Sequence, residues 1–242
     1  MPRAVCLAAV AVSGVTDAEE LVASGALACA RAARGVTCWG VDDKTIGAPP
    51  KGKFKQIAAG LTHACALDDK GAVICWGQGD WGRRGAFATP GITGALQVAA
   101  GDRHACVIGK DERVRCWGMN DAGQLGVKPD MTPRKKPTSV PGVAGAKKLV
   151  AGEASTCALL VDGTVRCWGS NGEGELGLGT RSQEEAPTRV GALEGVAQLC
   201  LASTHACALT SQGKLLCWGS NAFGQLGDGT KERRSVPTPV LW

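Results

Sequence analysis

The chain has 242 residues, of which 44% are apolar, and it contains 35 glycines, 12 cysteines and no tyrosine. Its formal net charge is only +5 and the basic and acidic residues are interspersed, so we expect no nucleic-acid partner. No apolar run approaches the roughly 18 residues that span a bilayer. This length suits one all-β propeller or barrel, and abundant glycine without low complexity favours short strands and tight turns.

The N-terminus allows two interpretations. The apolar stretch Ala4 to Val12 follows Met1-Pro2-Arg3 and resembles a clipped secretion signal, with Ala9-Val10-Ala11 as a cleavage-like triplet. Alternatively, residues 12–15 resemble residues 140–143 of a later repeat, which favours a chain that begins inside a repeat.

A repeat organises the rest of the chain. The tripeptide Cys-Trp-Gly begins at Cys38, Cys75, Cys116, Cys167 and Cys217, and each copy trails another cysteine by nine or ten residues. Such self-similarity is typical of a small β unit stacked many times. We therefore expect one domain over residues 1–242. Its repeats are expected at about 16–54, 55–91, 92–142, 143–192 and 193–242.

The fourth repeat illustrates the unit. Two strand-like runs, Thr156–Leu160 and Thr164–Gly169, flank Asp162-Gly163, which is a hairpin signal. If Cys157 and Cys167 lie opposite each other, the loop has three residues and Gly163 takes the left-handed position. The cysteines then occupy a non-hydrogen-bonded pair, where the Cα atoms approach to about 4.5 Å, within reach of a disulfide.

The same arithmetic applies to the other repeats, although Cys29 and Cys38 are nine apart and need a loop of even length. Cys6 and Cys200 are left over; they either join the N-terminus to the last unit, or Cys6 is removed with a signal. The predicted disulfides are Cys29–Cys38, Cys65–Cys75, Cys106–Cys116, Cys157–Cys167 and Cys207–Cys217.

Two other interpretations of these cysteines stay open. They can be small buried hydrophobes, or zinc ligands, because His63 and Cys65 share a strand face with Cys75 opposite. Ser155 replaces the histidine in the fourth unit, which argues against a metal. We expect no metal and no cofactor.

Each unit supplies four short strands. A glycine-punctuated loop follows each Trp-Gly, as in Asn120–Gly126, Asn171–Gly177 and Asn221–Gly227, and then comes a Pro-led extended segment. Both faces of the hairpins are apolar, so they are sandwiched between neighbouring sheets. The pattern predicts a β-propeller of four-stranded antiparallel blades. Five units make either a five-bladed ring or an incomplete one.

Two recurring motifs carry a family resemblance. Gly-x-x-His occurs at Gly60–His63 and Gly101–His104, and Trp-Gly-x-Asn-x-x-Gly-Gln-Leu-Gly occurs at Trp117–Gly126 and Trp218–Gly227. Together they resemble the regulator of chromosome condensation repeat family. The resemblance implies a propeller, usually of seven blades. It also implies one of three activities: nucleotide exchange on a small nuclear GTPase, ultraviolet-B perception through clustered tryptophans, or secreted inhibition of β-lactamases.

The sequence disfavours two of these three activities. Photoreception would place tryptophans in the Gly-x-x-His segments, where this chain has Leu61, Thr62, Asp102 and Arg103. Regular disulfides imply an oxidising compartment, which disfavours a nuclear exchange factor.

Catalysis is not indicated either. Because His63, His104 and His205 repeat, they are interpreted as structural, and no nucleophile–base set appears. We therefore predict that the protein is not an enzyme. The tryptophans of the five Cys-Trp-Gly motifs are interpreted as core.

The predicted function is binding outside the cytoplasm, in the medium, the periplasm or at the cell surface, with propeller loops presented to a protein or glycan partner. The alternatives are a guanine-nucleotide exchange factor and a secreted enzyme inhibitor. Trp81 and Phe223 share one loop position and are candidate aromatic anchors. Basic residues are either solvated loop charge or contacts for an acidic partner; the candidates are Arg83, Arg84, Arg134, Lys135 and Lys136. We expect the last three to lie in a Pro-flanked connector.

Overall fold

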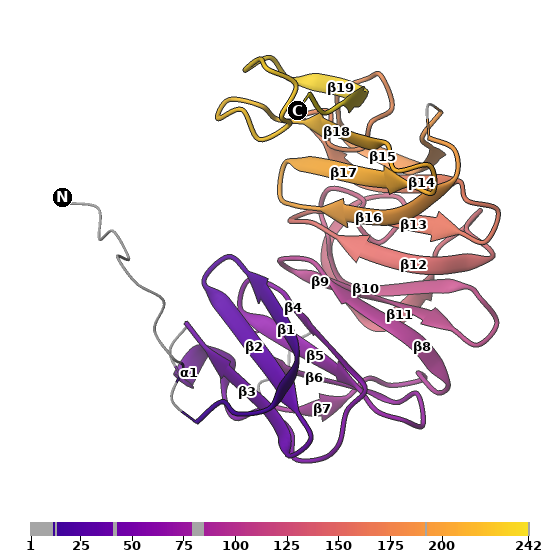
Figure 1. Cartoon of the computed structure of the whole chain (residues 1–242). Helices are drawn as coiled ribbons and strands as arrows, with labels where there is room; N and C mark the ends of the chain where they lie inside the picture. The colour runs from indigo at the N-terminus through magenta and orange to yellow at the C-terminus, as the bar shows by residue number, and fades with distance from the viewer. Residues whose placement is uncertain (1–11, 13, 41–42, 79–84, 192, 242) are drawn as a thin grey trace.

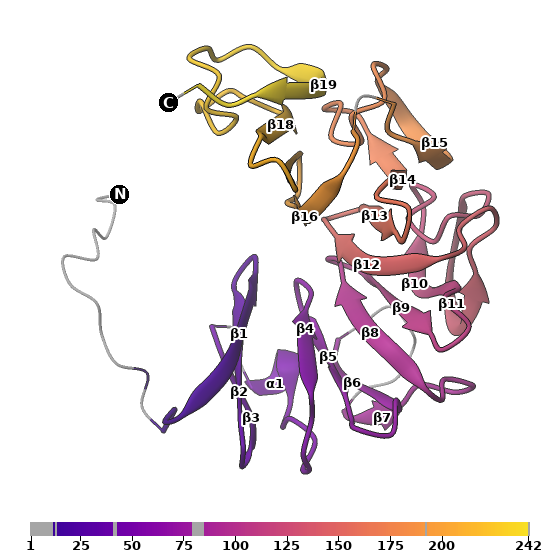
Figure 2. The same cartoon turned by 45° about the vertical axis from the view of Figure 1, so that its right-hand side comes forward.

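Antiparallel strands form five successive sheets in the computed structural model of the chain, which describes residues 12, 14–40, 43–78, 85–191 and 193–241. The sheets follow one another in chain order around a common centre, as the blades of a β-propeller (Figure 1). Figure 2 shows the first strand of each blade nearest the centre. The predicted fold class, an all-β propeller with five blades, is confirmed.

Every blade is a meander in which consecutive strands pair. The innermost strands are β1 (Ala18–Ser24), β4 (Gln56–Ala59), β8 (Ala95–Ala100), β12 (Ala146–Ala151) and β16 (Val196–Leu201). The second strands are β2 (Leu27–Ala32), β5 (His63–Leu67), β9 (His104–Gly109), β13 (Ser155–Leu160) and β17 (His205–Thr210). The third strands are β3 (Gly35–Trp39), β6 (Val73–Gly77), β10 (Val114–Asn120), β14 (Val165–Asn171) and β18 (Leu215–Gly219). The outer strands are β7 (Phe87–Ala88), β11 (Asp130–Ser139), β15 (Ser182–Arg189) and β19 (Arg234–Pro239).

The first blade differs from the other four. Its sheet has three strands in the described part of the chain, and the single-turn helix α1 (Asp43–Ile46) follows β3. The segment that corresponds to an outer strand contains Pro49-Pro50, which has no N–H group to donate to a neighbouring strand. Four strands per unit therefore describe the second to fifth blades.

The hairpin geometry follows from the loop sequence. Leu160 N–H donates to the Thr164 carbonyl at 2.9 Å, and Gly163 has φ of 79°, the left-handed conformation that its lack of a Cβ permits. This loop places Cys157 opposite Cys167, with Cα atoms 4.1 Å apart, and the two sulfurs are bonded. The three-residue turn and its register are as the sequence predicts.

All five predicted cysteine pairs are disulfides in the structure. The nine-residue separation of Cys29 and Cys38 is accommodated by a two-residue loop, because Ala32 pairs directly with Gly35. Each bridge closes a loop of about ten residues, which stabilises the fold by about 2.7 kcal/mol in the loop-entropy description.

The core lies between blades rather than within one. The tryptophans of the second to fifth blades are fully buried, and each lies opposite a small residue, as Trp76 does opposite Ala64. Trp39 of the first blade is only half-buried. Likewise Leu21 of β1 is 67% exposed, whereas its counterpart in β16, Leu199, is 1% exposed. The face of the first blade that points away from the second blade is therefore left partly uncovered.

A glutamine side chain joins β4 to β8, and another joins β8 to β12; we call this pair of hydrogen bonds the glutamine clamp. The Gln56 amide accepts from Val98 N–H at 2.9 Å and donates to the Val98 carbonyl at 3.0 Å. Gln97 makes the same pair of bonds with Leu149, at 2.8 and 2.9 Å. Gln198 occupies the corresponding place in β16, but its side chain is exposed and has no hydrogen bond to the described part of the chain.

The clamp predicts an asymmetry between two glutamines. We expect Gln97→Leu to lower the free energy of unfolding by about 1–3 kcal/mol, because the buried Leu149 loses partners for both its N–H and its carbonyl. Gln198→Leu is the matched control and should change it by less than about 0.5 kcal/mol. Denaturant titration without reductant measures both, and equal losses would contradict the clamp.

Candidate functional site

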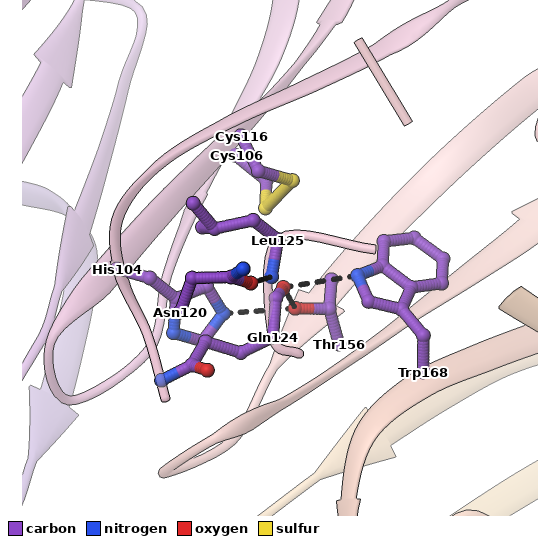
Figure 3. The surroundings of a disulfide bond; sticks show 8 residues. All are labelled: His104, Cys106, Cys116, Asn120, Gln124, Leu125, Thr156 and Trp168. Carbon is purple, nitrogen blue, oxygen red and sulfur yellow. Dashed lines mark hydrogen bonds between the residues drawn. A yellow bond between two sulfur atoms is a disulfide. The ribbon is translucent and has the colours of Figure 1, made fainter. Parts of the chain in front are cut away.

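In the third, fourth and fifth blades, one asparagine holds the loop that follows the tryptophan strand. Asn120 Oδ1 accepts from Leu125 N–H at 3.2 Å (Figure 3). Its Nδ2 donates to the Lys128 carbonyl at 2.8 Å. Asn171 and Asn221 hold the next two loops in the same way. The Asn-led motif therefore fixes these loop backbones from inside.

The same loops support the following blade. The Gln124 carbonyl accepts from Trp168 Nε1 at 2.9 Å and from Thr156 Oγ1 at 3.1 Å (Figure 3). His104 Nε2 lies 2.8 Å from Thr156 Oγ1. Since that hydroxyl already donates to Gln124, the neutral imidazole of His104 carries its proton on Nε2 and donates it to Thr156.

The repeated histidines are structural. His63 and His104 are fully buried, and loss of hydration lowers the pKa of each to about 3. His205 is half-buried, since no following blade covers it among the residues that the structure describes, and burial also lowers its pKa. The rings of His63 and His104 are neutral and pack between blades. The ring of His104 also makes a hydrogen bond to the next blade.

Phe223 is the most prominent exposed side chain of the loops. It is 91% exposed, and it follows Asn221 in the loop between β18 and β19. Its N–H donates to Gln225 Oε1 at 3.0 Å, while Asn221 Nδ2 donates to Asp228 Oδ1 at 3.0 Å. A rigid loop thus presents a bare aromatic ring. The other candidates of this kind, Trp81, Arg83 and Arg84, lie outside the described residues.

The basic run 134–136 is not in a connector, as the sequence suggested, but within strand β11. An outer strand tolerates Pro133 and Pro137 because one of its edges needs no hydrogen-bond donors, so this Pro-flanked segment pairs after all. Arg134 forms an ion pair with Asp130 at 2.8 Å. Lys135 and Lys136 are exposed. They belong to the third blade and Phe223 to the fifth, so these candidates do not form one patch.

A central cavity of about 760 Å³ lies between the inner strands of all five blades. Asp102, Lys148 and Glu153 bring charge to its wall. Burial raises the pKa of Asp102, and the Ser24 hydroxyl donates to its Oδ1 at 3.5 Å. Sequence reasoning missed this cavity, because it exists only once the blades are arranged around a centre.

A second hollow of about 670 Å³ lies between the loop of the third blade and strand β15 of the fourth. Pro129, Pro141 and Pro187 line it together with Lys128 and Glu184. In the described part of the chain, no three His, Cys, Asp or Glu side chains are placed to hold a metal ion. The described residues also include no helix with the length and hydrophobicity that a membrane crossing requires.

Comparison with known proteins supports the repeat assignment. Two family models of the regulator of chromosome condensation (RCC1) repeat match the chain. One matches residues 54–82, 96–124, 146–175 and 196–225, and the other residues 111–159, 162–209 and 212–241. No curated protein matches the chain.

Solved structures of similar fold come from several organisms. Prp20p from Saccharomyces cerevisiae is 22% identical with a TM-score of 0.79, over 93% of this chain and 63% of that one. Human WBSCR16 is 24% identical with a TM-score of 0.77, over 90% and 66%. The receptor kinase CR4 ectodomain from Physcomitrella patens is 24% identical with a TM-score of 0.59, over 88% and 54%. The chain thus spans less than two thirds of the length of each.

The buried histidines predict a loss of stability in mild acid. Each has a folded pKa of about 3, below its unfolded value near 6.5, so the unfolded chain takes up protons first as the pH falls. Stability is therefore full above pH 6.5 and falls towards pH 3, by about 2 kcal/mol per histidine at pH 5.

Denaturant titrations at pH 7 and pH 5 without reductant measure this loss. His104→Gln should remove about half of the difference. His205→Gln is the control and should remove less, because that ring is half-exposed. An unchanged pH dependence in His104→Gln would contradict the assignment.

Proposed function

Because the chain belongs to the regulator of chromosome condensation (RCC1) repeat family, we propose that it is a non-enzymatic binding protein whose propeller loops engage a protein partner in an oxidising compartment outside the cytoplasm. The repeat itself is a scaffold, and a scaffold takes its specificity from the loops that it holds in place.

The exposed ring of Phe223 carries this proposal. Water contact of a whole phenyl ring is unfavourable, and the hydrogen bonds of Asn221 and Gln225 prevent the loop from folding the ring back against the blade. An aromatic side chain on a pre-ordered loop loses little conformational freedom on binding. Such residues are the usual energetic centres of protein interfaces.

The five disulfides support a location in an oxidising compartment. Thiols in a reducing cytosol are kept unpaired, whereas in this chain each blade has a cysteine pair in bonding register. Bridges of this kind persist in the medium, in the periplasm or at a cell surface.

Exposed lysines favour an acidic protein over a neutral glycan. Lys135 and Lys136 are exposed on the outer strand of the third blade, while Arg134 is neutralised by Asp130. They lie apart from Phe223, so they act on the approach of a partner through long-range attraction rather than in the same contact. We expect this contribution to weaken with salt.

Nucleotide exchange on a small GTPase is the competing function. Binding to Gsp1p and to histones has been studied for Prp20p. The likeness to Prp20p is one of fold, and fold alone does not transfer an activity. Faster release of labelled GDP from a small GTPase on addition of this protein would replace our proposal. Inhibition of a secreted enzyme, such as a β-lactamase, would be a specific form of the protein binding that we propose.

Partner binding is tested at position 223. A photo-crosslinking phenylalanine analogue placed there, in cells that make the protein, should capture one protein species, and the same analogue at the exposed Val161 should not. Phe223→Ala should then weaken binding of the captured protein about 10- to 30-fold, the size of a typical interface hot spot. Val161→Ala is the matched control. Equal affinity of both variants would reject the loop as the site.

The compartment is tested by intact mass. Protein isolated from its native source after alkylation of free thiols should gain two hydrogen atoms per bridge on reduction, for all five bridges. Alkylation of these cysteines before reduction would place the protein in a reducing compartment. That result leaves the Phe223 experiment unaffected, so the two parts of the proposal fail separately.

A further inference from the structure

Three cysteines lie in one row across the fifth blade. Cys200 of β16 is the cross-strand partner of Cys207 of β17, and Cys207 is the partner of Cys217 of β18, to which it is bonded. Residues directly opposite each other in antiparallel strands point to the same face of the sheet. Cys200 therefore places a free thiol beside the Cys207–Cys217 disulfide.

This row exists in the fifth blade and in no other blade of the described structure. The residues that face the second-strand cysteine elsewhere are apolar: Val22, Ala58, Ala99 and Val150. The other disulfides have no neighbouring thiol at this position, so the packing of a blade does not require one.

The fifth disulfide is also more accessible than those of the second, third and fourth blades. Cys65, Cys106 and Cys157 are fully buried beneath the following blade, whereas Cys207 is partly exposed. Cys200 itself is exposed and lines the central cavity of about 760 Å³. Solvent and small reagents thus reach both the thiol and the sulfur next to it.

The backbone register allows Cys207 to bond on either side. Ala202 N–H donates to the His205 carbonyl at 2.8 Å, which makes that pair hydrogen-bonded, and two residues further along Cys200 and Cys207 form a pair of the same type. Their Cα atoms are then expected about 5.5 Å apart, the commonest separation in disulfides.

We propose that Cys200, Cys207 and Cys217 form a thiol–disulfide exchange site. The Cys200 thiolate attacks Cys207 Sγ, the new Cys200–Cys207 bond forms as the Cys207–Cys217 bond breaks, and Cys217 leaves as a thiolate that takes up the proton lost from Cys200. One disulfide and one thiol are present before and after, so no oxidant or reductant is consumed. The three sulfurs lie in a row, with the attacking and leaving sulfurs on opposite sides of Cys207.

The exchange transfers a cross-link within the blade. In one form the bridge joins β17 to β18 and the thiol faces the central cavity; in the other it joins β16 to β17 and the thiol is on β18. The site gives an otherwise inert scaffold one reactive sulfur, which is exposed at Cys200 in the first form and lies at the buried Cys217 in the second.

Peptide mapping tests the exchange directly, because trypsin cuts after Lys214. Because Cys217 is buried, native protein is first quenched in acid and unfolded, then alkylated with N-ethylmaleimide and digested. The Cys207–Cys217 form gives residues 190–214 cross-linked to residues 215–231, whereas the exchanged form gives residues 190–214 with an internal bond and residues 215–231 alkylated at Cys217. We expect both forms. Before alkylation, their interconversion should speed up about tenfold per pH unit from pH 5 to 7, because only the thiolate attacks.

Two variants complete the experiment. Cys200→Ser should abolish alkylation of Cys217 and leave only the cross-linked peptides. Val150→Cys, made together with Cys200→Ser, places a thiol beside the buried Cys157–Cys167 bond, where trypsin also separates the alternatives after Arg166. It should exchange at least about tenfold more slowly, since access limits the reaction. Wild-type protein labelled at Cys200 alone, at every pH and time, would overturn the proposal.

Discussion

Every blade of this propeller depends on a neighbour, because its central hairpin is apolar on both faces. The indole of Trp168 illustrates the contact: it lies opposite Thr156 of its own blade and donates to the Gln124 carbonyl of the blade before it. The loop that supplies this carbonyl is in turn fixed by Asn120. At Trp168 and Trp218, burial of the indole and rigidity of the preceding loop therefore depend on each other, and a loose loop would leave a buried indole N–H without a partner.

This mutual dependence explains where the molecule is open. In the described part of the chain, the second, third and fourth blades have a neighbouring blade on both sides, whereas the first and fifth have one each. Leu21 on the first blade and His205 and Cys207 on the fifth are correspondingly exposed or half-buried, although their counterparts elsewhere are buried. Exposure in this fold is thus set by position in the series, and residues of identical type acquire different chemistry from it. The lowered pKa of His104 and the milder environment of His205 are one example.

The sequence predicts the repeated features well and the unique ones poorly. Cysteine spacing and the Asp-Gly turn predict register to the residue, because loop length and side-chain alternation leave one antiparallel pairing. The flanking prolines wrongly indicated a connector for the basic run Arg134–Lys136, which lies in strand β11. An outer strand accommodates proline because one of its edges needs no N–H donor. The central cavity and the row at Cys200 depend on contacts across strands and blades that no local pattern encodes. Phe223 was identified from its loop position, but its exposure needed the structure.

Both the disulfide of a blade and its packing against neighbouring blades contribute to the stability of that blade. In a repeat series, stability is a sum of the intrinsic stability of each unit and the contacts with its neighbours. A blade with two neighbours gains from both, and its bridge lies sealed beneath the next sheet. The fifth blade gains from one neighbour in the described structure, so it relies more on its bridge, and that bridge is partly exposed. A thiol at Cys200 keeps the blade cross-linked through exchange, since attack from either side of Cys207 breaks one bond only as it forms another. One of the two end blades thus has a cross-link that can move without being lost.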